Sequence, residues 1–344
     1  MKDVLGMAGI FFIFIGISAG AEEYKQLFLF HEGLAVAQTT SEEWVVINTQ
    51  GEIVLSLSKL NLGGSLFSEG LMAVRTSSGK YGFIDITGKM VIQPHYSYAQ
   101  PFSEGLAVVL VPSTGHDTKS KYGYVRKNGE VAIPLQYDNA TSFHSGRAFV
   151  YRESGWFLID QSGMFVTTQA FETVREFSEG LAAVRVNKRW GYINRDGVWK
   201  IPPCFTAAFP FSDGLAGVSR MGSSGWDFID REGNVVFERV VDTIQFESTL
   251  YFQEGWAVIP KGNKYWYLST DGRTLPAIYD RATDFSKGVA AVTIDGKAGI
   301  IDQTGNWVVP PGEFDGLGYF WEGRALAGKD GKTGYINAKG EWLF

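Results

Sequence analysis

Few residues in this 344-residue chain are of the types that perform acid–base, nucleophilic or metal chemistry near neutral pH. The candidates are four histidines and one cysteine: His31, His95, His116, His144 and Cys204. No two histidines are spaced as metal ligands, and neither an HExxH nor a CxxC motif occurs. We expect Cys204 to be a small buried side chain, because the sequence places no base beside it that would activate a thiol. The sequence therefore predicts no metal, no cofactor and no catalytic residue.

A row of acidic residues recurs along the chain, and each member directly precedes a glycine. The row consists of Glu32, Glu69, Glu104, Glu179, Asp213, Glu254 and Glu322. Ser145 and Lys287 occupy the same position in two further places. Carboxylates aligned on one rim could attract cations or a basic ligand. We expect instead that each accepts hydrogen bonds in its own turn, because the position tolerates Ser and Lys without any change in the flanking pattern.

A second row mixes Asp with Asn, each three residues before another glycine. Its members are Asn48, Asp85, Asp160, Asn194, Asp230, Asp302 and Asn337. Serial carboxylates occur in calcium sites, and paired carboxylates occur in glycosidases. Asn replaces Asp freely here, which ionic coordination would not favour, whereas either side chain can hydrogen-bond the backbone at the start of a turn. We therefore interpret this row as turn residues.

Both rows belong to a longer repeat, which begins with a Phe followed three residues later by a Gly. Nine copies occur, with 33 to 41 residues between successive Phe residues. These residues are Phe30, Phe67, Phe102, Phe143, Phe177, Phe211, Phe252, Phe285 and Phe320. Between the glycine turns, side chains alternate with period two, which is typical of short antiparallel strands. An aromatic residue also precedes the Phe by six positions in eight copies. We therefore expect neighbouring copies to stack and share a core.

These features predict an all-β fold of nine tandem β-meanders, each of about 36 residues with three or four short strands. Three arrangements fit the pattern: a β-propeller-like ring, a curved open β-solenoid, and a stack of hairpins. The unit is short for a four-stranded propeller blade. The pattern slightly favours a ring or a curved stack and leaves the choice between them open.

The repeat also resembles a known family. The segments "KYGFIDITGKMVIQPHY" (80–96) and "RWGYINRDGVWKIPPCF" (189–205), with the recurring "FSEGLA", are similar to the WG-repeat, or KWG-repeat, proteins of bacteria. The resemblance covers Tyr24 to Phe344, although Ala298 and Thr333 replace the motif aromatic. It implies an exported or surface-associated repeat module with no settled common activity.

The N-terminal segment differs from the rest of the chain. Lys2 precedes a run from Val4 to Ala21 that carries no charge and ends in Ala-Gly-Ala, the small-x-small pattern of a signal-peptidase site. We therefore expect residues 1–21 to be a signal peptide and residues 22–344 to form one exported domain, periplasmic, at the cell surface or secreted. No stable membrane span is expected after cleavage. The net charge of −6 and the absence of Lys/Arg clusters argue against nucleic acid as a partner.

Residues that break the repeat are the best candidates for function, because variable loops on a rigid scaffold carry specificity. The candidate binding residues are Arg147, Arg324, His116, Lys119 and Asp242. The two arginines replace a Leu, and the other three lie in lengthened segments at 110–121 and 238–248. We expect an exported, non-catalytic module that binds or scaffolds a protein or a cell-surface glycan. The alternative is an exported, glycosidase-like hydrolase with its site in a central channel or on a concave face.

Overall fold

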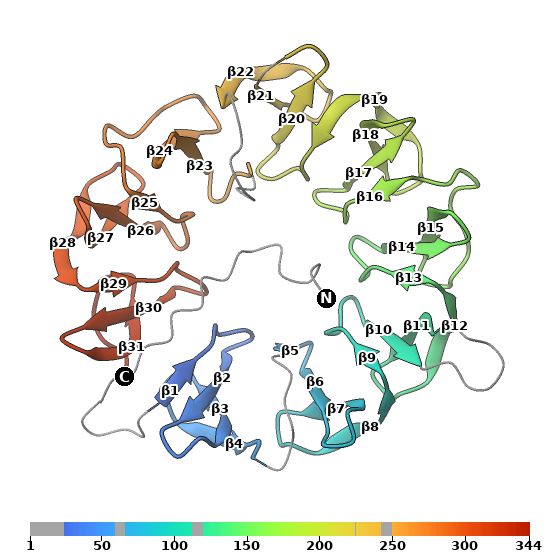
Figure 1. The fold of residues 1–344 in the computed structure, drawn as a ribbon, viewed down its shortest axis with the longest axis horizontal. Coiled ribbons are helices and arrows are strands. Elements are labelled where there is room, and N and C mark those ends of the chain that lie inside the picture. Colours follow the sequence, from blue (N-terminus) through green and yellow to red (C-terminus); the bar gives the residue numbers. More distant parts are fainter. Residues whose placement is uncertain (1–23, 59–65, 112–119, 224, 242–249) are drawn as a thin grey trace.

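The computed structural model describes residues 24–58, 66–111, 120–223, 225–241 and 250–344. Within these ranges every regular element is a β-strand. The strands form a closed ring of radially arranged sheets around a central opening, so the all-β ring is confirmed and the open solenoid is excluded (Figure 1). In the same ranges no helix is long and apolar enough to cross a membrane. The expected signal peptide, residues 1–21, lies outside them.

The nine repeats form nine blades, which we number 1 to 9 in chain order, and blades 5 and 6 share one seven-stranded sheet. The strands are, for blade 1, β1 (Tyr24–Leu27), β2 (Leu34–Thr39), β3 (Trp44–Asn48) and β4 (Ile53–Ser56); for blade 2, β5 (Phe67–Ser68), β6 (Leu71–Arg75), β7 (Tyr81–Asp85) and β8 (Met90–Tyr96); for blade 3, β9 (Tyr98–Ala99), β10 (Leu106–Val111), β11 (Lys121–Arg126) and β12 (Val131–Tyr137); for blade 4, β13 (Asn139–Ala140), β14 (Arg147–Arg152) and β15 (Gly155–Asp160); for blades 5 and 6, β16 (Thr173–Val174), β17 (Leu181–Val186), β18 (Arg189–Asn194), β19 (Trp199–Ala208), β20 (Ala216–Arg220), β21 (Trp226–Ile229) and β22 (Val235–Val241); for blade 7, β23 (Trp256–Lys261) and β24 (Lys264–Ser269); for blade 8, β25 (Arg281–Ala282), β26 (Val289–Ile294), β27 (Lys297–Asp302) and β28 (Trp307–Phe314); and for blade 9, β29 (Gly316–Leu317), β30 (Arg324–Lys329) and β31 (Lys332–Asn337).

A complete blade has four antiparallel strands, as in the order β9-β10-β11-β12 from the opening outward (Figure 1). The short repeat is long enough for this because the outermost strand of one blade runs on into the innermost strand of the next. In β19 the two are one strand, and Phe205 pairs with Trp190 of blade 5 and with Arg220 of blade 6. Sharing one stretch of chain between two blades removes the long connection that a separate inner strand would need.

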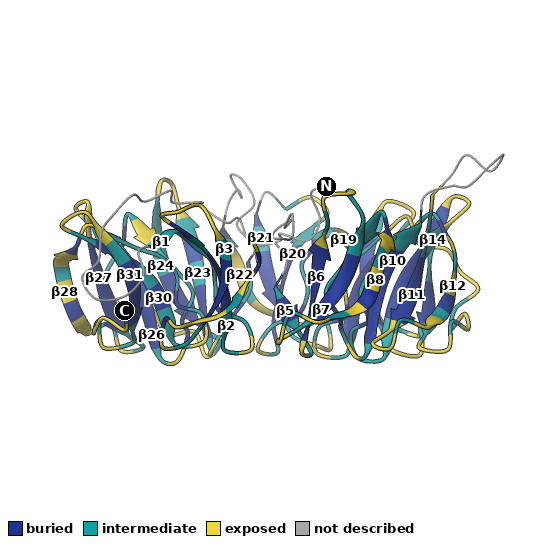
Figure 2. Ribbon diagram, turned by 90° about the horizontal axis from the view of Figure 1, so that it is seen from below, coloured by how far each residue is buried: buried dark blue, intermediate teal, exposed yellow. Residues whose placement is uncertain are grey.

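Each blade is a layer buried on both faces, so the alternation of side chains serves two cores. In β10, Ala107 and Val109 pack in the cluster shared with blade 2, whereas Leu106 and Val108 pack in the cluster shared with blade 4. Burial of apolar surface contributes about 25 cal/mol per Å², and here it accrues only between neighbours. Figure 2 shows these buried strands across the thickness of the ring, with exposed residues mainly in the loops.

The same contacts that join the other blades join blade 9 to blade 1. The rings of Tyr124 and Phe143 lie 4.9 Å apart between blades 3 and 4, and those of Tyr335 and Phe30 lie 4.9 Å apart between blades 9 and 1. The Tyr124 hydroxyl donates to a backbone carbonyl of the following blade at 2.8 Å, and the Tyr335 hydroxyl donates likewise to the Phe28 carbonyl. The ring is therefore closed without a covalent link.

Candidate functional site

The Phe-x-x-Gly segment of each repeat forms a tight hairpin turn between the two innermost strands, which we call the inner turn. Both central residues have positive φ, as at Glu179 (52°) and Gly180 (77°), which is the type I′ geometry that suits a two-residue hairpin. Figure 1 shows these hairpin tips directed toward the central opening. The inner turns lie at the same end of the strands as the turns of the Asp/Asn row, and we call this side of the ring the turn face.

The carboxylates of the inner turns do not bond within their own turns, and that expectation was wrong. Each accepts a hydrogen bond from the backbone of the next inner turn around the ring. Glu32 accepts from the N–H groups of Glu69 (2.6 Å) and Gly70 (3.0 Å), and Glu254 accepts from Lys287 (2.7 Å) and Gly288 (2.8 Å). The remaining pairs are Glu69 with Gly105, Glu104 with Gly146, Glu179 with Gly214, Asp213 with Gly255, and Glu322 with Glu32 and Gly33. The last pair joins blade 9 to blade 1, and the row thus forms a structural belt of hydrogen bonds between neighbouring blades.

Two junctions of this belt have no carboxylate. Ser145 stands where blade 4 would reach the inner turn of blade 5, and Lys287 stands where blade 8 would reach that of blade 9. Among the described residues, the N–H groups of Glu179 and Gly180 consequently have no acceptor. At the second junction the Lys287 side chain lies over Gly323, with its Cγ 3.5 Å from the position of a Cβ there.

The junction between blades 4 and 5 also gathers other residues that depart from the repeat. Arg147 donates from Nε to the Arg195 carbonyl of blade 5 (2.6 Å) and from Nη1 to the Gly146 carbonyl (3.0 Å). Arg231 reaches from blade 6 and donates to the Glu179 carbonyl. These arginines line an open recess of about 1020 Å³ on the turn face.

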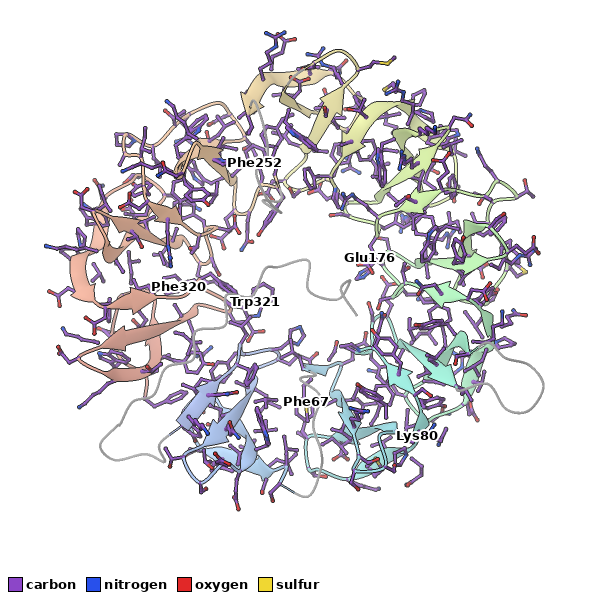
Figure 3. The ribbon with its side chains drawn as sticks, viewed as in Figure 1. Phe67, Lys80, Glu176, Phe252, Phe320 and Trp321 are labelled. Carbon is purple, nitrogen blue, oxygen red and sulfur yellow. The ribbon has the colours of Figure 1, made fainter. Side chains whose placement is uncertain are left out.

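His144 provides a further departure at this junction. Elsewhere a Ser at this position binds the next blade: Ser103 Oγ donates to the Phe143 carbonyl at 2.6 Å, and Ser178 Oγ donates to the Phe211 carbonyl at 2.7 Å. This position is thus an inter-blade contact. His144 Nε2 instead lies 3.2 Å from Glu176 Oε2, and this hydrogen bond raises the pKa of His144. Figure 3 places Glu176 beside the central opening.

The Asp/Asn row forms turns, as the sequence predicts. Asn194 Oδ1 accepts hydrogen bonds from the N–H groups of Asp196 (3.0 Å) and Val198 (2.9 Å). Asp85, Asp160 and Asp302 also accept from a hydroxyl two residues on, and the hydrogen bond from Thr304 lowers the pKa of Asp302. Within the described part of the chain, no three His, Cys, Asp or Glu side chains are grouped as metal ligands.

The sequence analysis did not find one acid whose pKa is raised, because no pattern marks its position directly before the Phe that begins a repeat. Burial raises the pKa of Asp284, whose Oδ2 accepts a hydrogen bond from the Tyr251 hydroxyl at 2.5 Å. A raised pKa is what a general acid needs. No second carboxylate contacts Asp284 within the described ranges, so the pair that glycoside hydrolysis requires is not assembled there.

The sequence-predicted residues are not brought to one place. Arg147 and Arg324 both follow the glycine of an inner turn on the turn face, but they lie in blades 4 and 9. The Arg324 guanidinium stacks over Phe30, 5.2 Å from the ring centre, and so serves ring closure. His116, Lys119 and Asp242 lie outside the described residues. The strand ends that bound residues 112–119, Val111 and Lys121, lie on the side opposite the turn face.

Cys204 is exposed, which corrects the expectation of a buried side chain. Its place on β19 at the outside of the ring, between residues that face the core, explains the difference. Desolvation by its surroundings raises the pKa of the thiol, which lowers its thiolate fraction and its reactivity.

Comparison with protein families identifies the repeat. The family described as "WG containing repeat" matches residues 81–111, 122–154, 156–190, 190–220, 274–297 and 299–332, which together make up more than half of the chain. The chain belongs to the WG-repeat family. No curated protein matches it.

Several solved structures have a distant likeness to this WG-repeat ring. A computationally designed protein, Ika8, is 12% identical with a TM-score of 0.45, over 94% of this chain and 98% of that one. BamB from Moraxella catarrhalis is 14% identical with a TM-score of 0.42, over 95% and 96%. The WD40 domain of SCAP from fission yeast is 10% identical with a TM-score of 0.42, over 94% and 97%.

The glycine that gives the WG motif its name has a packing reason in this structure. A Cβ on Gly191 would lie 2.6 Å from the Ile201 carbonyl oxygen and 2.8 Å from the Pro203 nitrogen. The outer strand bulges toward the motif strand at this point. Only a residue without a side chain permits that approach.

Proposed function

We propose that this WG-repeat protein is an exported, non-catalytic module that holds a protein partner on its turn face. The observation that carries the proposal is the junction between blades 4 and 5. There His144, Ser145 and Arg147 stand where most repeats have Ser, an acidic residue and Leu, respectively. The recess beside them is open to solvent. Departures from a repeat that gather at one open place are what a specific binding surface needs on a rigid scaffold.

The chemistry of the inner ring supports binding over hydrolysis. A glycosidase needs two carboxyl groups about 5 to 10 Å apart across its substrate, one of them protonated. In this protein the inner-turn carboxylates are engaged by backbone N–H groups of the neighbouring blade. Asp284, which has the raised pKa, is bonded to Tyr251. The departures at the blade 4–5 junction are a histidine, a serine and an arginine, which offer hydrogen bonds and positive charge.

Export is supported by the uncharged run that ends at Ala21 and by the small residues that precede Glu22. We expect the mature chain to begin at Glu22. N-terminal sequencing of protein recovered from outside the cytoplasm tests this, and a first residue of Met1 would contradict it.

The binding function is tested by affinity capture with residues 22–344 from an extract of the producing cells' envelope and medium. A captured protein is then purified, and its binding is measured by calorimetry with and without a chelator. We expect saturable binding that the chelator does not change. Loss of binding on chelation, chemical conversion of the captured molecule, or capture of glycan alone would contradict the proposal.

A further inference from the structure

The inner ring shows seven times how this fold binds a carboxylate. In each instance the glycine N–H of a type I′ turn, in three of them together with the N–H of the residue before it, donates to one acidic side chain, with separations from 2.6 to 3.4 Å. Successive N–H groups in left-handed conformation form a concave anion site. The turn of Glu179 and Gly180 has φ angles like those of the seven turns that bind a carboxylate. Blade 4, however, has Ser145 in the acidic position, and a Ser side chain is short and carries no carboxylate.

The space that a glutamate from blade 4 would fill is open. Ser145 and Gly180 both line the recess on the turn face, which is open to solvent. The recess around it is lined by Ser145, Arg147, Gly180, Arg195 and Arg231, together with Glu104, Glu179 and Asp196. Glu104 and Glu179 are already bonded to the turns at Gly146 and Gly214.

Three arginines and three carboxylates line the recess, and two of the carboxylates are already bonded to backbone N–H groups. Arg147 is held by the carbonyls of Arg195 and Gly146, so its guanidinium is positioned in advance. Its remaining nitrogen, Nη2, lies 3.9 Å from an exposed Asp196 carboxylate, which is a weak contact that a closer anion can replace. A planar guanidinium and a pair of backbone N–H groups both suit a carboxylate.

The second gap lacks this opening. The aliphatic part of Lys287 covers Gly323, and Arg324 is stacked over Phe30 and donates to the Glu322 carbonyl at 3.3 Å. The two gaps therefore differ: Lys287 covers the turn of blade 9, whereas the turn of blade 5 borders the open recess.

We infer that the turn of Glu179 and Gly180, with Arg147 and Arg231, binds an acidic side chain of a partner protein in place of the missing inner-turn glutamate. This inference rests on the proposed binding function and names the chemistry of its site. A peptide carboxylate is favoured over a sugar acid because the seven occupants of equivalent turns are Glu or Asp side chains that extend from a peptide backbone.

The experiment follows backbone amide signals of the 15N-labelled chain during titration with a short glutamate-containing peptide. The same peptide with glutamine in place of glutamate is the control ligand. We expect the Glu179 and Gly180 amides to shift with the glutamate peptide alone. The Gly214 amide, which Glu179 already occupies, is expected to stay in place.

Four variants test the assignment. Ser145→Glu is expected to fill the gap from within, abolish peptide binding and raise the melting temperature. Arg147→Leu restores the usual residue, and Arg231→Gln is expected to keep the bond to the Glu179 carbonyl, as Gln303 does to the Glu254 carbonyl at 3.2 Å. Arg147→Leu and Arg231→Gln are each expected to lower the affinity for the glutamate peptide at least tenfold. Lys127→Gln, the same kind of change at a junction already filled by Glu69, is expected to leave affinity unchanged.

Any of three results would overturn the site. The first is an equal shift of the Gly180 and Gly214 amide signals, and the second is equal binding of the glutamine and glutamate peptides. The third is binding of the glutamate peptide to Ser145→Glu or Arg231→Gln as tightly as to the wild type. Binding of an oligomer of galacturonic acid without binding of the peptide would assign it to glycans instead. If a captured partner binds these variants as well as it binds the wild type, the proposed function stands and this site is wrong. If the wild type captures no protein, the proposed function itself fails.

Discussion

Each inner turn combines a local cost with a longer-range gain. A residue with a side chain at positive φ is strained by roughly 1 to 3 kcal/mol, and Glu32 adopts φ of 54°. Its carboxylate accepts two N–H groups of the next blade, and hydrogen bonds to a charged group contribute about 1.5 to 3 kcal/mol, less where solvent screens them. The two effects are of similar size, but Ser145 also has positive φ (57°) and so keeps the strain without the hydrogen bonds.

Glu32→Gln tests this balance. An amide oxygen can accept one of the two N–H groups, but the amide nitrogen opposes the other, and we expect the free energy of unfolding to fall by about 1 kcal/mol. Urea titration at neutral pH measures it. Glu130→Gln, at an exposed carboxylate with no partner shown in the described part of the chain, is the control. Equal effects would mean that the belt does not contribute to stability.

Because the Asp residues of the second row have lowered pKa values, we expect the stability of the fold to decrease at acidic pH. The hydrogen bond from Thr304 lowers the pKa of Asp302 in the folded state. The stability from this group is therefore present above the unfolded pKa, about 3.9, and is lost as the pH falls through the lower folded value. Asp302→Asn keeps the turn and removes the titration. We expect its stability deficit at pH 7 to shrink between about pH 4 and pH 2, as unfolding curves across that range would show. A deficit that stays constant would contradict the assignment.

At the scale of the blade, the WG glycine and the strand that crosses from blade to blade depend on each other. The outer strand bulges so that Trp190 pairs with Phe205 while Tyr192 pairs with Ile201. The bulge turns the chain toward the next blade and carries its carbonyl against Gly191. The motif thus marks the point where one blade ends and the next begins.

Gly191→Ala is expected to destabilise the protein by about 2 kcal/mol, because the added methyl group meets backbone atoms that cannot rotate away. Gly318→Ala is the matched control. A Cβ on Gly318 would lie 3.5 Å from its nearest neighbour, the Leu326 carbonyl oxygen, and Gly318 does not have a positive φ. Thermal melts of both variants measure the difference, and a Gly191→Ala protein as stable as the control would show that the outer strand can move aside.

At the scale of the molecule, closure of the ring joins nine blades, none of which can bury both its apolar faces alone, into one structure. Blade 9 meets blade 1 through the shared core of Phe30, Tyr335 and Phe344 and through Glu322. Phe344 lies against Gly51, as Ile201 lies against Gly233 between blades 5 and 6. Since each blade packs only against its neighbours, the closing junction stabilises two blades that would otherwise be open ends.

Phe344→Ala tests the closure. Loss of its packing against Phe30 and Tyr335 is expected to lower the free energy of unfolding by about 2 kcal/mol. The neighbouring Leu343 is 37% exposed, and Leu343→Ala is expected to cost much less. Urea unfolding of the two variants gives the comparison. A similar small cost for both would mean that the ring does not depend on this contact.

The sequence by itself determined the features that are local to one repeat. Period-two alternation shows strands, and glycine at positive φ shows the turns, because both follow from the backbone within a few residues. The same pattern singled out Arg147 as a departure. The partner of each inner-turn carboxylate could not be found in this way. The N–H groups that it binds lie 33 to 42 residues away along the chain, or 289 and 290 for Glu322, and become neighbours only when blades stack. For the same reason Ser145 looked like a tolerated substitution until the structure showed the position that it leaves empty. The choice between a ring and a solenoid likewise depended on the tertiary structure. Closure requires a rotation between neighbouring blades that adds up over nine junctions, and no local sequence pattern encodes that rotation.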